Sequence, residues 1–381
     1  MELSLLDIVI VLVKAAVAMG LLLKMAAMIT WVERKGSALI QNRIGANRAA
    51  ILGWDFAGIL NTLICDPVKA ITKEDFVPKG TSQFMHSLAP FLAVFPIILS
   101  FAVIPFGPSF HVGGREITMQ LADLGVGVLY VFAMGSLAVY GVVLAGWVSN
   151  NKFSLLGGLR ASAQMISYEV TLGLSIIGLI ASYGTLDLNE IIRIQGGSTT
   201  FGLPAWGIFT CFPLNIVAFI IFFTSMMAET KRAPFDLPES ESELIAGYFT
   251  EYSGMKFLLF WLGEFAEIVV ASAVISVLFF GGWQLPFIDN AFLSEKIYSL
   301  LSWLMGEGAN SYLPNASIIG ALIGFTVFGL KVSFFSVLQV VIRWTLPRFR
   351  YDQLMNLCWK IMLPISLVNM VLTSALLIWR K

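Results

Sequence analysis

Residues 228–254 read AETKRAPFDLPESESELIAGYFTEYSG and separate two long apolar runs, 205–228 and 255–280. The segment carries six carboxylates and two cations: Glu229, Asp236, Glu239, Glu241, Glu243, Glu251, Lys231 and Arg232. Acidic side chains in or beside a bilayer are costly, so a cluster of them predicts a functional site. The segment also contains Phe235, Leu237 and Tyr248, which are too apolar for a freely solvated loop. We therefore expect it to fold into a cavity or beneath a partner subunit.

The composition of the whole chain predicts a membrane protein. Of 381 residues, 57% are hydrophobic and 13% are charged, whereas soluble domains average roughly 25% charged residues. The net charge of zero argues against a nucleic-acid partner. Cys65, Cys211 and Cys358 stand far apart, so neither a metal site nor a disulfide framework is expected.

The apolar runs predict an all-α polytopic membrane protein. A membrane span needs about 20 mostly apolar residues. Eight runs qualify, and we expect them to form one integral membrane domain, residues 1–381, with spans near 7–32, 86–106, 123–148, 163–183, 205–228, 255–280, 316–342 and 357–379.

Lysine and arginine are distributed unevenly between the loops. The first, third, fifth and seventh loops carry 15 of these residues, and the opposite loops with the C-terminal tail carry 5. By the positive-inside rule, the charged loops face the cytoplasm. We therefore expect a multi-pass protein of the cell (inner) membrane with both termini on the non-cytoplasmic side.

The loops between the spans also carry local patterns. WDFAGILNTLICDPVKAITKED (54–75) has apolar residues on one side, including Phe56 and Leu63, and predicts an interfacial amphipathic helix that Pro67 would end or kink. The stretch GPSFHVGGREITMQ (107–120) predicts a short hairpin or coil. Residues 286–313 show no clear pattern.

Several charged residues fall inside the predicted spans. They are Lys14, Lys24, Glu169, Glu264, Glu267 and Lys331. Each costs on the order of 3 kcal/mol near the bilayer centre unless it is paired, neutralised or hydrated. Glu264 and Glu267 are three residues apart, so on a helix they share a face and resist joint ionisation. One interpretation is a proton path; the plainer one is that Glu267 pairs with a lysine such as Lys331.

The two lysines of the first span and the fourth span have simpler expectations. Snorkelling toward the two membrane surfaces accounts for Lys14 and Lys24. Arg160, Gln164 and Tyr168 recur every four residues, and this polar stripe is expected to face protein or a cavity rather than lipid.

Three long motifs resemble the H-subunit family of respiratory NADH:quinone oxidoreductase (complex I). They are WVERKGSALIQNRIG (31–45), SNNKFSLLGGLRASAQMISYE (149–169) and the 228–254 segment. The resemblance implies a subunit that forms much of the quinone chamber and begins an acidic path into the membrane arm. The chain departs from the family pattern at two places. Gly45-Ala46-Asn47 stands where Gly-Pro is usual, and Cys65-Asp66, followed by Pro67, stands where the interfacial helix usually has Ala-Asp.

The resemblance assigns roles by position. Glu169, Glu229, Glu251 and Glu264 match the acidic path. Other residues match the quinone chamber and its entrance. Arg34 and Arg43 match basic residues near the entrance, and Asp66 and Lys69 match a polar pair in the amphipathic helix. The chamber loop is matched by Asp236, Glu239, Glu241 and Glu243. No bound cofactor is implied in this chain: quinone (ubiquinone or menaquinone) is the substrate. The implied partners are iron–sulfur subunits of the peripheral arm and antiporter-like membrane subunits.

Three alternatives remain open at this stage. The chain could be the related membrane subunit of a membrane-bound hydrogenase, which shares these motifs but not necessarily the quinone. It could be an ion transporter that uses the same carboxylates. It could also be a passive anchor for the peripheral arm, in which case neutralising the buried acids would leave activity intact.

Overall fold

The computed structural model describes residues 5–45, 58–112, 115–197, 202–238, 240–288, 290–305 and 316–380. Helices dominate these ranges, and seven of the helices described there are long and apolar enough to cross a membrane. These are α1 (Leu5–Ile40), α3 (Gln83–Val103), α4 (Gly127–Val148), α5 (Lys152–Tyr183), α10 (Gly254–Phe279), α12 (Ala316–Thr345) and the C-terminal run from α13 (Tyr351–Asn356) through π-helical Leu357–Met362 to α14 (Leu363–Arg380). The predicted all-α polytopic class is confirmed.

The fifth predicted span is divided in two. Residues 205–228 form α7 (Gly207–Thr210) and the 16-residue α8 (Leu214–Glu229), which is shorter than the other seven helices. Pro213 stands between them, and proline has no N–H to continue a helical ladder. Seven of the eight predicted spans coincide with long helices, and the total of eight stays a prediction.

Two helices extend well beyond their predicted limits. The first continues to Ile40, and the fourth starts at Lys152 instead of near residue 163. At the start of α5 the side chain of Asn151 accepts a hydrogen bond from the backbone N–H of Phe153, at 3.0 Å. This satisfies one of the N–H groups that a helix start leaves unpaired, so the Asn-rich stretch begins the helix rather than preceding it.

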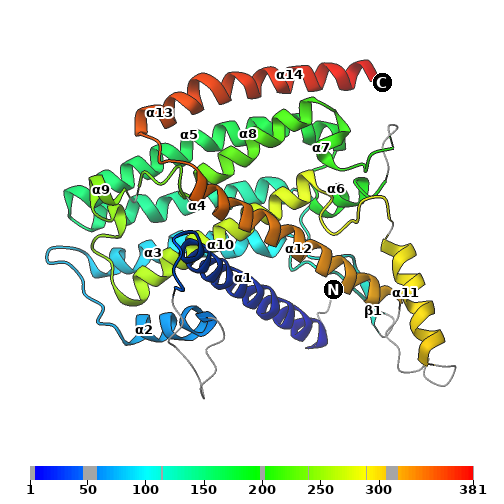
Figure 1. The fold of residues 1–381 in the computed structure, drawn as a ribbon, viewed down its shortest axis with the longest axis horizontal. Helices are drawn as coiled ribbons and strands as arrows, with labels where there is room; N and C mark the ends of the chain where they lie inside the picture. Colours follow the sequence, from blue (N-terminus) through cyan, green and yellow to red (C-terminus); the bar gives the residue numbers. More distant parts are fainter. Residues whose placement is uncertain are drawn as a thin grey trace.

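The centre of the bundle is α10, which packs against α1, α3 and α12. In the most apolar 18-residue stretch of α10, 94% of the residues are buried, whereas in the corresponding stretch of α1 only 11% are buried. Figure 1 shows α1 along one edge of the bundle and α14 along the opposite edge, beside α5 and α8. The charged side chains of α10 are therefore enclosed by protein, whereas α1 and α14 expose apolar surface suited to lipid.

The short elements gather at the two ends of the bundle. Figure 1 shows α2 (Asp66–Thr72), α9 (Glu241–Leu244) and α13 at one end, which we call the motif end. At the other end lie both termini, α6 (Leu188–Ile194), α11 (Asn290–Met305) and the hairpin of β1 (Phe110–Val112) and β2 (Arg115–Ile117). The two strands pair antiparallel, which confirms the predicted hairpin.

The interfacial segment is helical on both sides of Pro67. A π-helical turn, Asn61–Cys65, leads directly into α2, and Pro67 lies in the first turn of α2. The helical run continues through Pro67, so this proline does not end it. The π-helical turn just before it, in which the N–H of Asp66 bonds to the carbonyl of Asn61, is the local irregularity that accompanies the proline. Leu63, Val68 and Ile71 are exposed, as expected for a helix that lies on a membrane surface. Phe56 and Ala46-Asn47 lie outside the described residues.

The prediction of an unpatterned loop at 286–313 is wrong for residues 290–305, which form α11 and pack against α12. The sequence of this helix, NAFLSEKIYSLLSWLM, mixes apolar residues with polar and charged ones along its whole length. Its mixed polarity is typical of a helix at the edge of a bundle, which a search for long apolar runs does not detect.

Candidate functional site

Arg232 is the centre of a buried ion network at the motif end of the bundle. It follows α8 directly, and its side chain is 10% exposed. One guanidinium nitrogen lies 3.4 Å from the carboxylate of Glu264 on α10, and another lies 3.7 Å from the carboxylate of Glu33 on α1. The guanidinium also stacks over the ring of Phe265, 4.1 Å from its centroid. A single cation thus joins two transmembrane helices through two acids.

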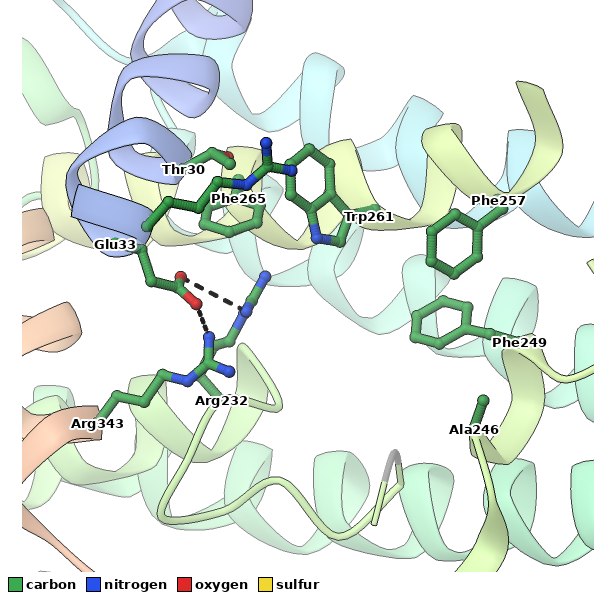
Figure 2. A pocket seen from close by; sticks show the side chains of 10 residues that line it. Thr30, Glu33, Arg232, Ala246, Phe249, Phe257, Trp261, Phe265 and Arg343 are labelled. Carbon is green, nitrogen blue, oxygen red and sulfur yellow. Dashed lines mark hydrogen bonds and ion pairs between the residues drawn. The ribbon is translucent and has the colours of Figure 1, made fainter. Parts of the chain in front are cut away.

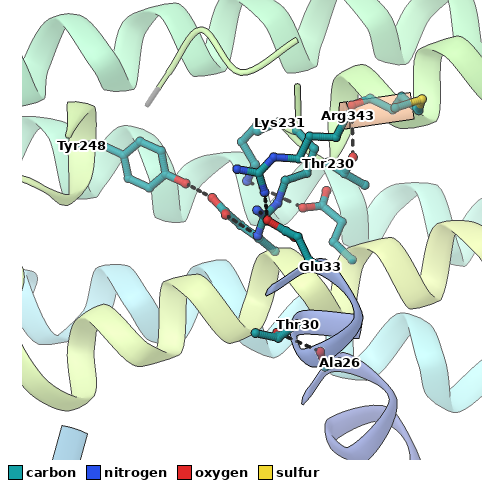
Figure 3. Close-up of polar contacts among 11 residues, drawn as sticks. Ala26, Thr30, Glu33, Thr230, Lys231, Tyr248 and Arg343 are labelled. Carbon is teal, nitrogen blue, oxygen red and sulfur yellow. Dashed lines mark hydrogen bonds and ion pairs between the residues drawn. The ribbon is translucent and has the colours of Figure 1, made fainter. Parts of the chain in front are cut away.

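The network continues from both acids (Figure 3). The phenol of Tyr248 donates a 2.9 Å hydrogen bond to Glu264, which is 3% exposed. Arg343 of α12 donates to the carboxylate of Glu33. The order of contacts is therefore Arg343, Glu33, Arg232, Glu264 and Tyr248. Only Glu264 and Arg232 were singled out from the sequence as charges; the other three become recognisable as partners only when α1, α10 and α12 are brought together.

Lys231 and Arg232 reach two acids one helical turn apart. Lys231 has a positive φ of 55°, an uncommon conformation for a residue with a side chain. Its ammonium group lies 3.7 Å from the carboxylate of Glu267. Glu264 and Glu267 share one face of α10, as predicted, and each is matched with one of the two adjacent cations. The expected partner of Glu267 is a lysine, but it is Lys231 instead of Lys331.

Lys331 has a different role in the structure. Its ammonium group donates to the backbone carbonyls of Phe280, Gly282 and Gln284, at 2.7, 2.9 and 2.6 Å. These carbonyls follow the end of α10, where a helix leaves acceptors unpaired and favours a cation. The suggested Glu267–Lys331 pair is therefore wrong, because backbone acceptors use all three hydrogens of this lysine.

A cavity of about 320 Å³ lies beside Arg232 (Figure 2). Its wall is formed by aromatic rings and three guanidinium groups, contributed by Phe249, Phe257, Trp261, Phe265, Arg34, Arg232 and Arg343. Arg232 is buried, and within the described part of the chain its Nε forms no hydrogen bond, nor does the terminal nitrogen that lies 3.4 Å from the carboxylate of Glu264. Buried donors without partners are costly, so the site suits a flat apolar group that carries hydrogen-bond acceptors.

Two further cavities adjoin the first and share Trp261 with it. One, of about 260 Å³, is lined by Arg34, Asp66 and Lys69, and the other, of about 250 Å³, by Lys24 and Asp66. Arg34 and Asp66 form an ion pair at 2.6 Å between α1 and the start of α2. The structure thus brings three of the predicted entrance residues together, with Asp66 paired to Arg34 and not to Lys69.

Arg43 lies apart from these cavities. It is exposed, and its Nε donates to the side chain of Gln41 at 2.7 Å. It is absent from the linings of the cavities found in the described part of the chain. Its predicted position at the quinone entrance is untested, since the following residues lie outside the described ranges.

Two of the four acids predicted for the path, Glu169 and Glu229, approach the same point of α4. Ser136 donates a hydrogen bond to Glu169 of α5. A side chain on the adjacent Gly135 would come within 2.8 Å of the carboxylate of Glu229. Glu229 also lines a small cavity of about 40 Å³ together with Glu267. Glu267 therefore joins Glu229 and Glu169 in one cluster, a position that its sequence context did not reveal.

Glu251 is held at the start of α5. Its carboxylate accepts a 2.8 Å hydrogen bond from Asn151. Its backbone carbonyl contacts the Nε2 atom of His86 at 3.3 Å. Glu251 thus lies on the side of the motif end formed by α3 and α5, at the rim of the bundle instead of within the Arg232 network.

The acidic loop divides into a buried and an exposed part. Asp236 is buried and forms a 2.7 Å ion pair with Arg348. Burial raises the pKa of Asp236 to about 6, although the neighbouring Arg348 opposes this shift. Glu243 is exposed and pairs with Arg160 at 2.6 Å. Glu239 and the side chain of Glu241 lie outside the described residues.

The predicted polar stripe of α5 fixes this loop in place. Gln164 donates to the backbone carbonyls of Ala228 and Phe235, at 2.7 and 2.8 Å. Tyr168 donates to the carbonyl of Leu354 at 3.0 Å. The stripe therefore faces protein, as expected, and holds the loop between α8 and α9 against α5.

These features define a class of protein: a polytopic helical membrane protein with a buried ion network beside an aromatic cavity and a cluster of intramembrane acids. A family model described as NADH dehydrogenase matches residues 13–374. The chain therefore belongs to the NADH dehydrogenase family.

Curated relatives match almost the full length. The chain is 40% identical to the H subunit of NADH-quinone oxidoreductase from Bdellovibrio bacteriovorus, covering 95% of this chain and 94% of that protein. It is 43% identical to the H 1 subunit of the same enzyme from Cytophaga hutchinsonii, covering 91% and 90%. It is 41% identical to the H 1 subunit from Solibacter usitatus, covering 98% of each chain.

Proposed function

We propose that this chain is the membrane subunit of a proton-pumping NADH:quinone oxidoreductase that forms part of the quinone chamber. Its similarity to H-subunit proteins over nearly its whole length supports this assignment. The observation that carries it is the 320 Å³ cavity with aromatic walls, into which the under-satisfied guanidinium of Arg232 faces. A quinone head group is flat, largely apolar and carries two acceptor oxygens.

Reduction of the quinone changes the charge beside Arg232. Conversion of a quinone to a quinol consumes two electrons and two protons, and the electrons come from an iron–sulfur subunit of the peripheral arm. Negative charge that develops on a quinone oxygen attracts the guanidinium of Arg232 and weakens its 3.4 Å contact with Glu264. Glu264 is then a buried carboxylate without its cation, which is energetically costly.

From Glu264 the change passes to the next acids. Glu267 lies one turn further along α10, and it lines the same small cavity as Glu229. Glu229 and Glu169 then approach α4 at Gly135 and Ser136. We propose that this cluster couples the state of the quinone to proton translocation toward antiporter-like membrane subunits. The ion pair of Asp236 with Arg348 holds the acidic loop, which we propose contributes to the quinone chamber.

The proposal includes an orientation. The motif end carries the lysine- and arginine-rich loops, so it faces the cytoplasm and the peripheral arm, and both termini lie on the non-cytoplasmic side. The membrane is the cell (inner) membrane.

The test is Glu229→Gln or Glu169→Gln in the assembled complex. Each change keeps the size of the side chain but removes the titratable group. We expect a large loss of NADH-driven proton pumping in proteoliposomes, with quinone reduction falling in parallel because the two processes are coupled. Glu190→Gln on α6, an exposed acid at the far end of the bundle, is the matched control and should leave both rates unchanged. Normal pumping in both path variants would contradict the proposed role.

A further inference from the structure

A groove lies at the end of the molecule opposite to the Arg232 network. It encloses about 160 Å³ between the first half of α1, the segment around the β1–β2 hairpin and Phe325 of α12. Figure 1 shows the start of α1 and β1 at the end where both chain termini lie. The groove is thus separate from the cavities proposed to hold quinone.

The shape of the groove follows the axis of α1. Val13, Val17 and Leu21 line it and recur every four residues, so they form one stripe on the helix. At a rise of 1.5 Å per residue the stripe is about 12 Å long. Val13 and Val17 are more than half exposed, so the groove opens onto the lipid-facing surface of α1. A narrow apolar groove parallel to a transmembrane helix matches the direction of a lipid acyl chain.

Lys14 is the one cation in the lining of this groove. It is half-buried, and its ammonium group donates to the hydroxyl of Thr118 at 3.2 Å. Among the described residues it forms no ion pair with a carboxylate, in contrast to Lys231 with Glu267 and Lys256 with Asp75. A lysine in a transmembrane helix is costly without a counter-charge. The groove surface itself is apolar, and the ammonium group of Lys14, one of its lining residues, has no carboxylate partner among the described residues.

We propose that this groove binds one anionic phospholipid, with an acyl chain along the α1 stripe and the phosphate at Lys14. A free phosphate would gain nothing from the apolar lining, whereas a neutral lipid would leave the charge of Lys14 uncompensated. The lipid fills the space between α1 and α12 where α1 has few protein contacts of its own, since only 11% of its most apolar window is buried. This inference is independent of the proposed quinone reduction.

The test is photolabelling of the complete complex, purified in mild detergent. The probes are phosphatidylglycerol with a diazirine in one acyl chain and phosphatidylcholine with the same chain. We expect phosphatidylglycerol to label the peptides that contain Val17 and Phe325. Lys14→Met should reduce this labelling about fivefold, the factor expected from one lysine near an anionic head group, and should not change labelling by phosphatidylcholine.

Matched variants separate the groove from general effects. Lys24→Met removes a charge from the same helix outside the groove and should leave labelling of these peptides unchanged. Lys14→Arg keeps the charge and should retain labelling. Val17→Trp fills the groove and should block both probes. NADH-driven quinone reduction should be normal in Lys14→Met. Absence of labelling in the unmodified complex, or equal labelling of Lys14→Met by phosphatidylglycerol, would overturn the inference.

Discussion

Replacing Arg348 by methionine should move the titration of Asp236 to higher pH. In the structure the two side chains form a 2.7 Å ion pair, and the pKa of the buried Asp236 is about 6. A carboxyl group is charged above its pKa, so the ion pair exists above about pH 6 and is lost as the pH falls through that value. Removing the cation leaves burial unopposed and raises the pKa of Asp236 further.

The size of the shift can be estimated from the contact. An opposite charge within about 4 Å lowers the pKa of a carboxyl group by roughly 1–3 units. Without Arg348 the pKa of Asp236 should therefore lie at roughly 7–9. At pH 7 the protonated fraction should rise from about one in ten to between about one half and nearly all of the molecules. The charge of the loop at neutral pH thus depends on this one arginine.

The assay is the pH dependence of NADH-driven quinone reduction by the assembled complex, together with infrared difference spectra of the protonated carboxyl band. We expect the acidic limb of activity in Arg348→Met to move upward by about 1–3 pH units. Arg348→Lys retains a positive charge and should shift the limb less. The carboxyl band assigned to Asp236 should be missing in Asp236→Asn. An unchanged acidic limb in Arg348→Met, or the same limb in Asp236→Asn, would refute the reasoning.

Three further predictions concern stability and coupling. Lys331→Met leaves three backbone carbonyls at the end of α10 without their donor. Because each hydrogen bond from a charged donor is worth about 1.5–3 kcal/mol, the complex should unfold at a lower temperature. Lys331→Arg should recover part of this loss. Gly141→Ala places a Cβ atom 2.7 Å from a Cα atom of α3 and should lower the free energy of unfolding by about 1–3 kcal/mol. Gly173→Ala, whose Cβ atom would meet no heavy atom within 4 Å, should leave the unfolding temperature unchanged in the same thermal assay. Tyr248→Phe removes the 2.9 Å hydrogen bond to Glu264 and should lower kcat by up to about tenfold with little change in KM; an unchanged kcat would show that Glu264 does not need this donor.

The membrane class and most of the helices could be predicted from the sequence because their physical causes are local. Long apolar runs form helices in lipid, since backbone groups there must be paired within the segment. The boundaries were less accurate, as at α5, where Asn151 caps a helix that starts at Lys152, well before the predicted span. A search for long apolar runs also missed two features. It did not detect α11, whose polarity is mixed, and it did not predict the break at the proline between α7 and α8.

The candidate site was predicted in part. Glu169, Glu229 and Glu264 stood out because a charge in an apolar run is unusual. The structure places Glu169 beside Ser136 and Glu264 beside Arg232, and Glu229 lines a small cavity together with Glu267. Glu33 and Arg343 did not stand out, because each lies just beyond the end of a predicted span (7–32 and 316–342), where a charge is ordinary. Lys331 did stand out, but its partners are backbone carbonyls, which no sequence pattern marks.

The sequence by itself determined that this chain lies in a membrane, where its charged loops gather, and which acids are too costly to be incidental. The tertiary structure decided which charges meet. It brings Glu33 of α1 and Glu264 of α10 to the two sides of Arg232. It also places Lys231 beside Glu267. Lys331 instead binds the backbone carbonyls at the end of α10. The physical reason is the distance over which each interaction acts. Solvation by lipid acts on each segment separately, whereas ion pairs form over a few ångströms between helices that are far apart along the chain.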